Sequence, residues 1–108
     1  MSEIIQVGLI QMTCSEEPEE NLRKAERRIE EAAARGARLI CLQELFRTRY
    51  FCQEEEVRHF DHAEPIPGPT SKRLAALTRR LNVTLVASLF EKRAEGLYHN
   101  TAIVLNGK

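Results

Sequence analysis

Two apolar runs stand on either side of one amphipathic segment in the first 43 residues, and this order constrains the fold more than any other feature. The first run, 4–12, has strand length and many β-branched residues, as in strands buried on both faces. The second run, 38–43, is of the same kind. A strand, a helix and a strand in this order predict a right-handed crossover and parallel pairing, and therefore an α/β fold.

Signals for the two ends of a helix bracket the amphipathic segment. Ser15 can cap a helix, Pro18 is tolerated in a first turn, and the nearby glutamates suit the positive end of a helix dipole. Gly36 is placed to end the helix in a left-handed conformation. One face of the helix is expected to pack on a sheet, because its apolar residues have helical spacing: Leu22, Ala25, Ile29, Ala32 and Ala33.

The second half of the chain begins with a long irregular stretch. Residues 44–69 lose their periodicity and end in a proline cluster, which predicts a loop with a short helix before the prolines. Thr70 or Ser71 is then expected to cap a helix whose apolar stripe is Leu74, Leu77 and Leu81. Two further strands and a hairpin turn between them complete the prediction: 83–90, 94–96 for the turn, and 97–105.

A strong hairpin signal, Asn106-Gly107, stands at the end of the sequence with only Lys108 after it. It announces a turn, and no strand follows. We therefore expect residues 1–108 to be the N-terminal part of a single domain that is truncated at its C-terminus. A frayed tail is the alternative interpretation.

Composition excludes several classes of function. The chain is 43% hydrophobic and 30% charged, as in ordinary soluble globular proteins, and its 16 basic residues balance its 16 acidic ones. No net field therefore favours nucleic acid or an anionic membrane. No apolar run approaches the roughly 18 residues of a membrane span, and no signal-peptide pattern opens the chain, so a cytoplasmic location is expected.

Glu44 is the first candidate for chemistry, because it stands at the predicted C-terminal end of the second strand. Open α/β sheets place their ligand crevice there. By strand alternation Glu44 shares a face with Ile40 and Leu42, so its carboxylate is expected to be partly desolvated and suited to general-base catalysis. The other interpretation is that Glu44 begins an exposed loop or caps the next helix, and position alone favours it.

The cysteines and histidines give weaker signals. Cys14, Cys41 and Cys52 form an odd set without metal-ligand spacing, which argues against a disulfide framework and a zinc site. Cys41 and Cys52 are possible nucleophiles activated by a histidine, but a cysteine in an apolar strand is more often a small core residue. The histidines lack metal-ligand spacing as well, so no metal is expected: His59, His62 and His99.

The segment 43–46, Gln-Glu-Leu-Phe, together with 39–42 before it, resembles the first motif of the nitrilase superfamily. Three more stretches match that family's layout: 7–12, 33–37 and 98–102. The resemblance covers essentially the whole chain. It looks closer to one branch, the N-carbamoylputrescine amidases, because of three further stretches: 50–53, 63–70 and 87–93.

This resemblance implies a four-layer α-β-β-α sandwich and the hydrolysis of N-carbamoylputrescine to putrescine, CO2 and ammonia, with no metal or organic cofactor. The family's chemistry uses a Glu-Lys-Cys triad, in which the glutamate activates the thiol, the thiolate attacks the carbamoyl carbon, and the lysine stabilises the charge on oxygen. Only Glu44 of that triad maps onto this chain, as the general base. The lysine and the cysteine are expected beyond residue 108, so these residues alone are expected to be inactive.

Four more residues take roles from the resemblance. Tyr50 and Phe51 lie on the loop that borders the substrate pocket, and they are candidates for contact with the carbamoyl group or the diamine chain, with loop packing as the alternative. Glu91 and Asn100 recur in the family's motif and are expected to brace the active-site strands through buried hydrogen bonds.

The resemblance also implies a homo-oligomeric enzyme whose partner is a small carbamoyl amine. Two other functions stay open. One is a non-catalytic α/β module for binding or assembly, which a lysine and a cysteine downstream would exclude. The other is a related enzyme, such as a D-amino-acid carbamoylase, a β-ureidopropionase or an aliphatic amidase. Activity on a cationic amine against an anionic acid would separate these enzymes.

Overall fold

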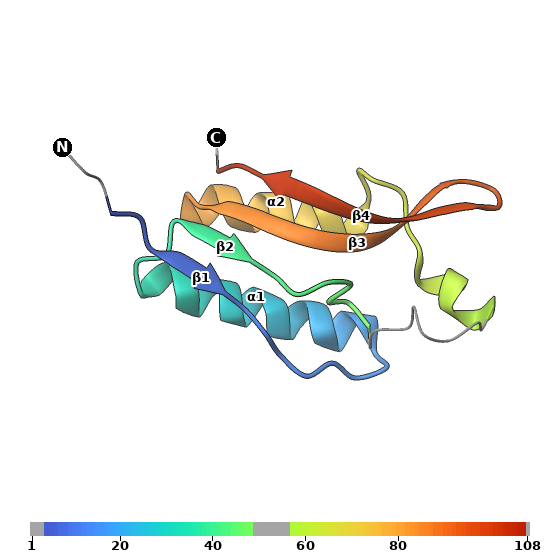
Figure 1. Ribbon diagram of the computed structural model, residues 1–108, viewed down its shortest axis with the longest axis horizontal. Helices are drawn as coiled ribbons and strands as arrows, with labels where there is room; N and C mark the ends of the chain where they lie inside the picture. The colour runs from blue at the N-terminus through green and yellow to red at the C-terminus, as the bar shows by residue number, and fades with distance from the viewer. Residues whose placement is uncertain (1–3, 49–56, 108) are drawn as a thin grey trace.

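The computed structural model describes residues 4–48 and 57–107 of the chain (Figure 1). Strands and helices alternate through the first half, as the sequence predicted. In chain order the elements are β1 (Val7–Leu9), α1 (Pro18–Ala34), β2 (Leu39–Cys41), the 3-10 helix η1 (Val57–His62), α2 (Pro69–Leu81), β3 (Thr84–Ala94) and β4 (Leu97–Leu105).

The strands of the described residues form one four-stranded sheet in the order β1-β2-β3-β4. β1 pairs with β2 in parallel, and β2 pairs with β3 in parallel, so the pairing predicted from the strand-helix-strand order is confirmed. β3 and β4 form an antiparallel hairpin. Its turn contains Gly96 at φ 75°, a left-handed conformation that glycine adopts without strain, and the hairpin predicted across 94–96 is confirmed.

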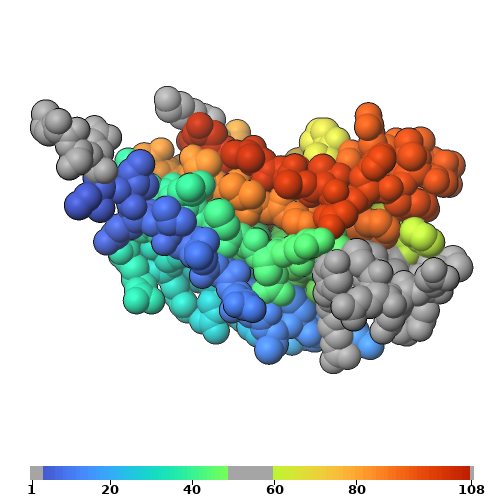
Figure 2. Space-filling view, in the orientation of Figure 1, coloured from blue at the N-terminus to red at the C-terminus, as the bar shows by residue number. Residues whose placement is uncertain are grey.

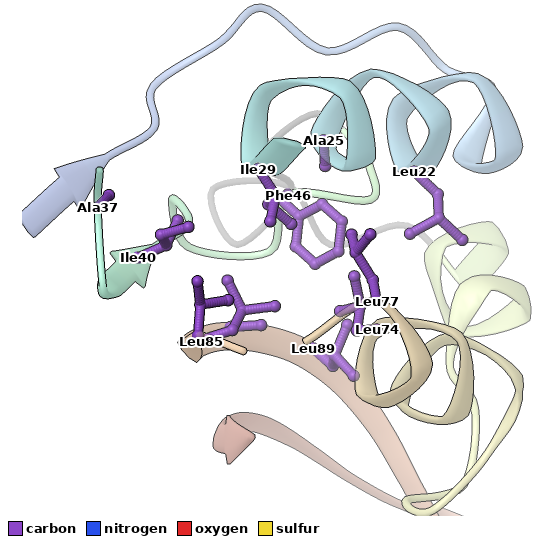
Figure 3. Close-up of a cluster of buried hydrophobic side chains, with 12 residues drawn as sticks. Leu22, Ala25, Ile29, Ala37, Ile40, Phe46, Leu74, Leu77, Leu85 and Leu89 are labelled. Atoms are coloured by element: carbon purple, nitrogen blue, oxygen red, sulfur yellow. The ribbon is translucent and has the colours of Figure 1, made fainter. Parts of the chain in front are cut away.

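Both helices lie on one face of the sheet and enclose the core with it (Figures 1 and 3). Along β3 the side chains alternate, so that Leu85, Ala87 and Leu89 are buried toward the helices while their neighbours point to the other face. The apolar stripes predicted for the two helices supply much of the remainder, together with Ile40 of β2 and Phe46 of the turn after it. Its largest contributors are Leu22, Ile29, Ile40, Phe46, Leu74, Leu77, Leu85 and Leu89.

The helix ends confirm one prediction and correct two. Gly36 adopts φ 98° after α1, and the amide of Ala37 bonds to the carbonyl of Ala32, as in a Schellman motif. Ser15 does not cap α1, because the helix begins at Pro18 and the Ser15 hydroxyl instead accepts from the amide of Glu17. Neither Thr70 nor Ser71 is the N-cap of α2, because Gly68 takes that position. The Ser71 hydroxyl lies in the first turn and accepts from the amide of Gly68.

The face of the sheet opposite the helices is open in the part of the chain that the structure describes. Figure 2 shows it toward the viewer, with β1 to β4 as neighbouring bands from blue to red. Val7, Leu9 and Val104 are 52%, 79% and 67% exposed there. The expectation that the first strand is buried on both faces is therefore not met within the described residues, where β1 is an edge strand that α1 covers on one side only. The two layers seen are one helical layer and one sheet.

Candidate active site

The chain turns sharply just after β2, and Glu44 is the first residue of this turn. The predicted second strand ends early, at Cys41, and the turn runs over 44–47. Leu45 has φ 50°, which is unfavourable for a side chain of its size, and it is buried together with Phe46. Because two apolar side chains are drawn into the core, the carboxylate before them is directed away from it.

Glu44 contacts the open face of the sheet. Asn100 Nδ2 donates to Glu44 Oε1 at 2.6 Å, and Asn100 lies on β4. The expectation that Glu44 shares a face with Ile40 is therefore wrong, since Ile40 points to the helices and is fully buried. Strand alternation stops applying where the strand stops, at Cys41. Glu44 is also exposed rather than partly desolvated, because none of the described elements covers this face.

Ser88 on β3 completes the arrangement around Glu44, and sequence reasoning did not single it out. Its hydroxyl donates to Asn100 Oδ1 at 2.9 Å and accepts from the amide of Leu45 at 3.1 Å. The only signal in the sequence is a hydroxyl within the apolar run 85–90, at a position whose neighbours are Ala87 and Leu89. That pattern marks an open face, and it does not identify a partner 43 residues away.

The far side of the turn is fastened to the start of α1. Asn21 is only 1% exposed, and its Nδ2 donates to the carbonyls of Arg47 at 2.7 Å and Ser15 at 2.8 Å. Its Oδ1 accepts from the amide of Ser15 at 2.8 Å. The thiol of Cys14 donates to the carbonyl of Phe46 at 3.1 Å, and burial raises the pKa of that thiol, which keeps it protonated as a donor.

Asn21→Ala is expected to lower the free energy of unfolding by about 1–3 kcal/mol, because it leaves partly buried carbonyl and amide groups without the partner that they have in the parent. Urea unfolding followed by circular dichroism measures the loss. A change below about 0.5 kcal/mol, as at an ordinary surface position, would show that water replaces the Asn21 side chain and that the turn does not depend on it.

A second group of side chains lies beyond the turn, toward the end of the β3–β4 hairpin. Arg47 Nη1 lies 3.3 Å from Glu64 Oε2, and the backbone of Glu64 bonds to β3 through the carbonyl of Phe90 and the amide of Lys92. The rings of Phe60, Phe90 and Tyr98 stack beside it, with centroids 4.6–5.9 Å apart. The turn is thus connected to the hairpin as well as to the core.

The other candidate residues are spread over the fold. Tyr50, Phe51 and Cys52 lie outside the described residues. Cys41 is partly buried at the end of β2. His62 lies in η1 and His99 in β4.

Glu91 on β3 accepts from the hydroxyl of Thr101 on β4 at 2.9 Å, a partly buried bond that joins the two strands as expected. Asn100 instead bonds to Glu44, at an exposed position. Over residues 4–48 and 57–107, no group of three potential ligand side chains could hold a metal ion. Over the same residues, neither α1 nor α2 is long and apolar enough to cross a membrane.

Comparisons with known proteins identify a family and several relatives of this chain. Residues 6–108 match the family model described as carbon-nitrogen hydrolase. An N-carbamoylputrescine amidase of Oryza sativa subsp. japonica is 37% identical over 93% of this chain and 34% of its own length. A citrullinase of Francisella tularensis is 34% identical over 93% of this chain and 35% of its own length.

Solved structures agree. The crystal structure of a carbon-nitrogen hydrolase from Helicobacter pylori has a TM-score of 0.82 and 34% identity, over 95% of this chain and 36% of that one. The chain therefore spans about a third of the length of the relatives that it matches. The α/β fold expected from the sequence is the fold of that solved structure.

Proposed function

This chain belongs to the carbon-nitrogen hydrolase family, the nitrilase superfamily, and from that premise we propose that the complete protein hydrolyses the C–N bond of a carbamoyl amine. The substrate that we propose is N-carbamoylputrescine, with putrescine, CO2 and ammonia as products. The observation that supports this most directly is the carboxylate of Glu44, held by Asn100 at the C-terminal end of a parallel strand. That is where open α/β sheets bind their ligands.

In the proposed reaction Glu44 is the general base. Its carboxylate takes the proton of a cysteine thiol, and the thiolate attacks the carbamoyl carbon. A lysine stabilises the charge that develops on the carbonyl oxygen. When the adduct collapses, ammonia leaves with the proton that Glu44 took from the thiol, and a thiocarbamate stays on the cysteine. Glu44, again a carboxylate, then takes a proton from the water that attacks the thiocarbamate and returns it to the leaving thiolate. The carbamate released in this step loses CO2 to give putrescine. The thiol and the amine are proposed to come from the part of the protein that follows residue 108.

Tyr50 and Phe51 stay candidates for substrate contact, because they follow the turn that carries Glu44. An aromatic ring suits either end of this substrate, since it packs on an alkyl chain and attracts an ammonium group at its face. A cytoplasmic homo-oligomer without metal or organic cofactor, as expected from the sequence, also stays a prediction.

A substrate panel tests the proposal. The protein expressed from its complete gene is assayed for ammonia release from N-carbamoylputrescine, citrulline, an N-carbamoyl-D-amino acid, β-ureidopropionate and an aliphatic amide. We expect kcat/KM to be highest for N-carbamoylputrescine, by about tenfold or more over the substrates that carry a carboxylate, because one uncompensated charge in a pocket strongly disfavours binding.

Other outcomes of the panel separate the alternatives. A preference for citrulline would keep the reaction and replace the substrate, as in the relative named for that activity. A preference for the anionic ureido acids would favour a carbamoylase or a β-ureidopropionase. No ammonia from any of the five would contradict the enzyme and favour a binding or assembly module.

A further inference from the structure

Glu44 is held by a chain of hydrogen bonds whose direction is set at every link, and we propose that Ser88 and Asn100 are positioning residues that orient Glu44 for proton transfer. This inference rests on the proposed function. The chain of bonds, which we call the Ser88 relay, runs from the amide of Leu45 through Ser88 and Asn100 to Glu44.

The sheet register brings the members of the relay together. Ser88 pairs with Ala102 across the hairpin, so Asn100 is its diagonal neighbour on the same face, within reach of a short polar side chain. In the parallel pairing of β2 with β3, Cys41 stands beside Val86, which places the turn after β2 next to Ser88. Residues 43 and 56 positions apart in sequence thus meet at one point.

The Ser88 hydroxyl determines how the Asn100 amide is oriented. A serine hydroxyl has one hydrogen to donate. Ser88 Oγ accepts from the amide of Leu45, and its hydrogen is donated to Asn100 Oδ1, 2.9 Å away. The Nδ2 group of Asn100 must then face Glu44, to which it donates at 2.6 Å. The reverse orientation would bring the amide oxygen against a carboxylate.

The relay therefore selects which oxygen of Glu44 transfers protons. The bond donated by Asn100 occupies Oε1. No hydrogen bond from the described residues reaches Oε2. We assign proton transfer to Oε2, with Oε1 as the point by which the carboxylate is held.

Ser88 also supports the backbone on which Glu44 stands. Leu45 has φ 50°, a conformation that is unfavourable for such a residue and persists only where surrounding contacts enforce it. The bond from the Leu45 amide to Ser88 Oγ is one such contact. A single hydroxyl thus fixes both the strained turn and, through Asn100, the direction of the carboxylate.

Two single variants of the complete enzyme test the relay, and a third serves as the control. Ammonia release from the best substrate is measured for each. Asn100→Asp keeps the shape of the side chain but replaces the donor that faces Glu44 by an acceptor, and is expected to lower kcat by about 100-fold. Ser88→Ala is expected to lower kcat by about tenfold. KM should stay within about twofold in both, because neither side chain is proposed to touch substrate.

Thr101→Val is the matched control. It is nearly isosteric, it lies next to Asn100 on β4, and it removes a hydroxyl bond of the same length, 2.9 Å, which goes to Glu91 instead of Glu44. It should keep kcat within about twofold. The double variant Ser88→Ala/Asn100→Asp should lose less than the product of the single losses, since Ser88 acts through Asn100.

The outcomes are distinct. If Glu44→Gln is inactive while Asn100→Asp is as active as Thr101→Val, the relay is wrong and the proposed function stands. The relay is also wrong if all three variants lose kcat to the same extent and lose thermal stability to the same extent, because the role of these side chains would then be purely structural. If the parent enzyme releases no ammonia, the proposed function falls. Crystal structures then decide the relay: Glu44 should turn away from residue 100 in Asn100→Asp and keep its position in Thr101→Val.

Discussion

Replacement of Glu44 by glutamine is expected to lower kcat of the complete enzyme by about 100- to 10,000-fold, which is the range that a positioned general base contributes. Glutamine keeps the shape of the side chain and an oxygen that can accept from Asn100, so the turn should keep its conformation. What is lost is the ability to take a proton from the thiol or from water. Ammonia release at saturating substrate measures the effect, and circular dichroism checks the fold.

Glu95→Gln gives a matched control for this result. Glu95 lies in the hairpin turn between β3 and β4, and its side chain is 92% exposed. In the part of the chain that the structure describes, it pairs only with Lys92, whose side chain is half-buried. The same chemical change there should leave kcat unchanged within about twofold. If Glu44→Gln retained more than about a tenth of the parent activity, Glu44 would not be the base.

Phe46→Ala is expected to lower the free energy of unfolding by about 3–5 kcal/mol, the usual loss when a large aromatic side chain is removed from a core. Phe46 is fully buried, and in Figure 3 its ring lies in the middle of the labelled cluster, between Ile29 and Leu77. It comes from the turn rather than from a helix or strand. The mutation therefore removes the anchor that holds the turn of Glu44 in the core, and kcat should fall with stability.

Phe60→Ala is the comparison for that prediction. The same atoms are removed, but Phe60 is 42% exposed and its contacts in the described residues are with Phe90 and Tyr98 at the hairpin. A loss of about 1 kcal/mol is expected there. Both values are read from the midpoint of urea unfolding with a common slope. Equal losses at the two positions would contradict the central place of Phe46 in the core.

Features that depend on neighbours in sequence could be predicted from the sequence. Gly36 ends a helix and Gly96 forms a hairpin turn because each supplies a left-handed conformation within a few residues of the element it terminates. The helical stripes that contain Leu22 and Leu74 are likewise local patterns, and both face the core. Glu44 lies in the turn that follows the second strand and is exposed there, which fits the interpretation that it begins an exposed loop.

Features that depend on distant residues could not be predicted. Alternation put Glu44 on the face of Ile40, because the sequence does not show that the strand ends at Cys41 and that the turn then redirects the chain. Ser88 was missed since its importance lies in partners on two other elements. Whether one hydroxyl meets one carboxamide depends on the register of β3 with β4, and that register is fixed by the whole fold.

The turn after β2 is anchored on three sides: by Asn21 to the start of α1, by Phe46 in the core, and by Ser88 on β3. Each anchor restricts torsional freedom that a carboxylate on a free loop would have to lose whenever it met a proton donor. Here that torsional freedom is lost once, when the chain folds. The contacts that stabilise the domain offset this loss of conformational entropy. In the proposed reaction the entropy of orienting Glu44 therefore belongs to the folding equilibrium, and the barrier of each catalytic cycle is expected to be lower by that amount.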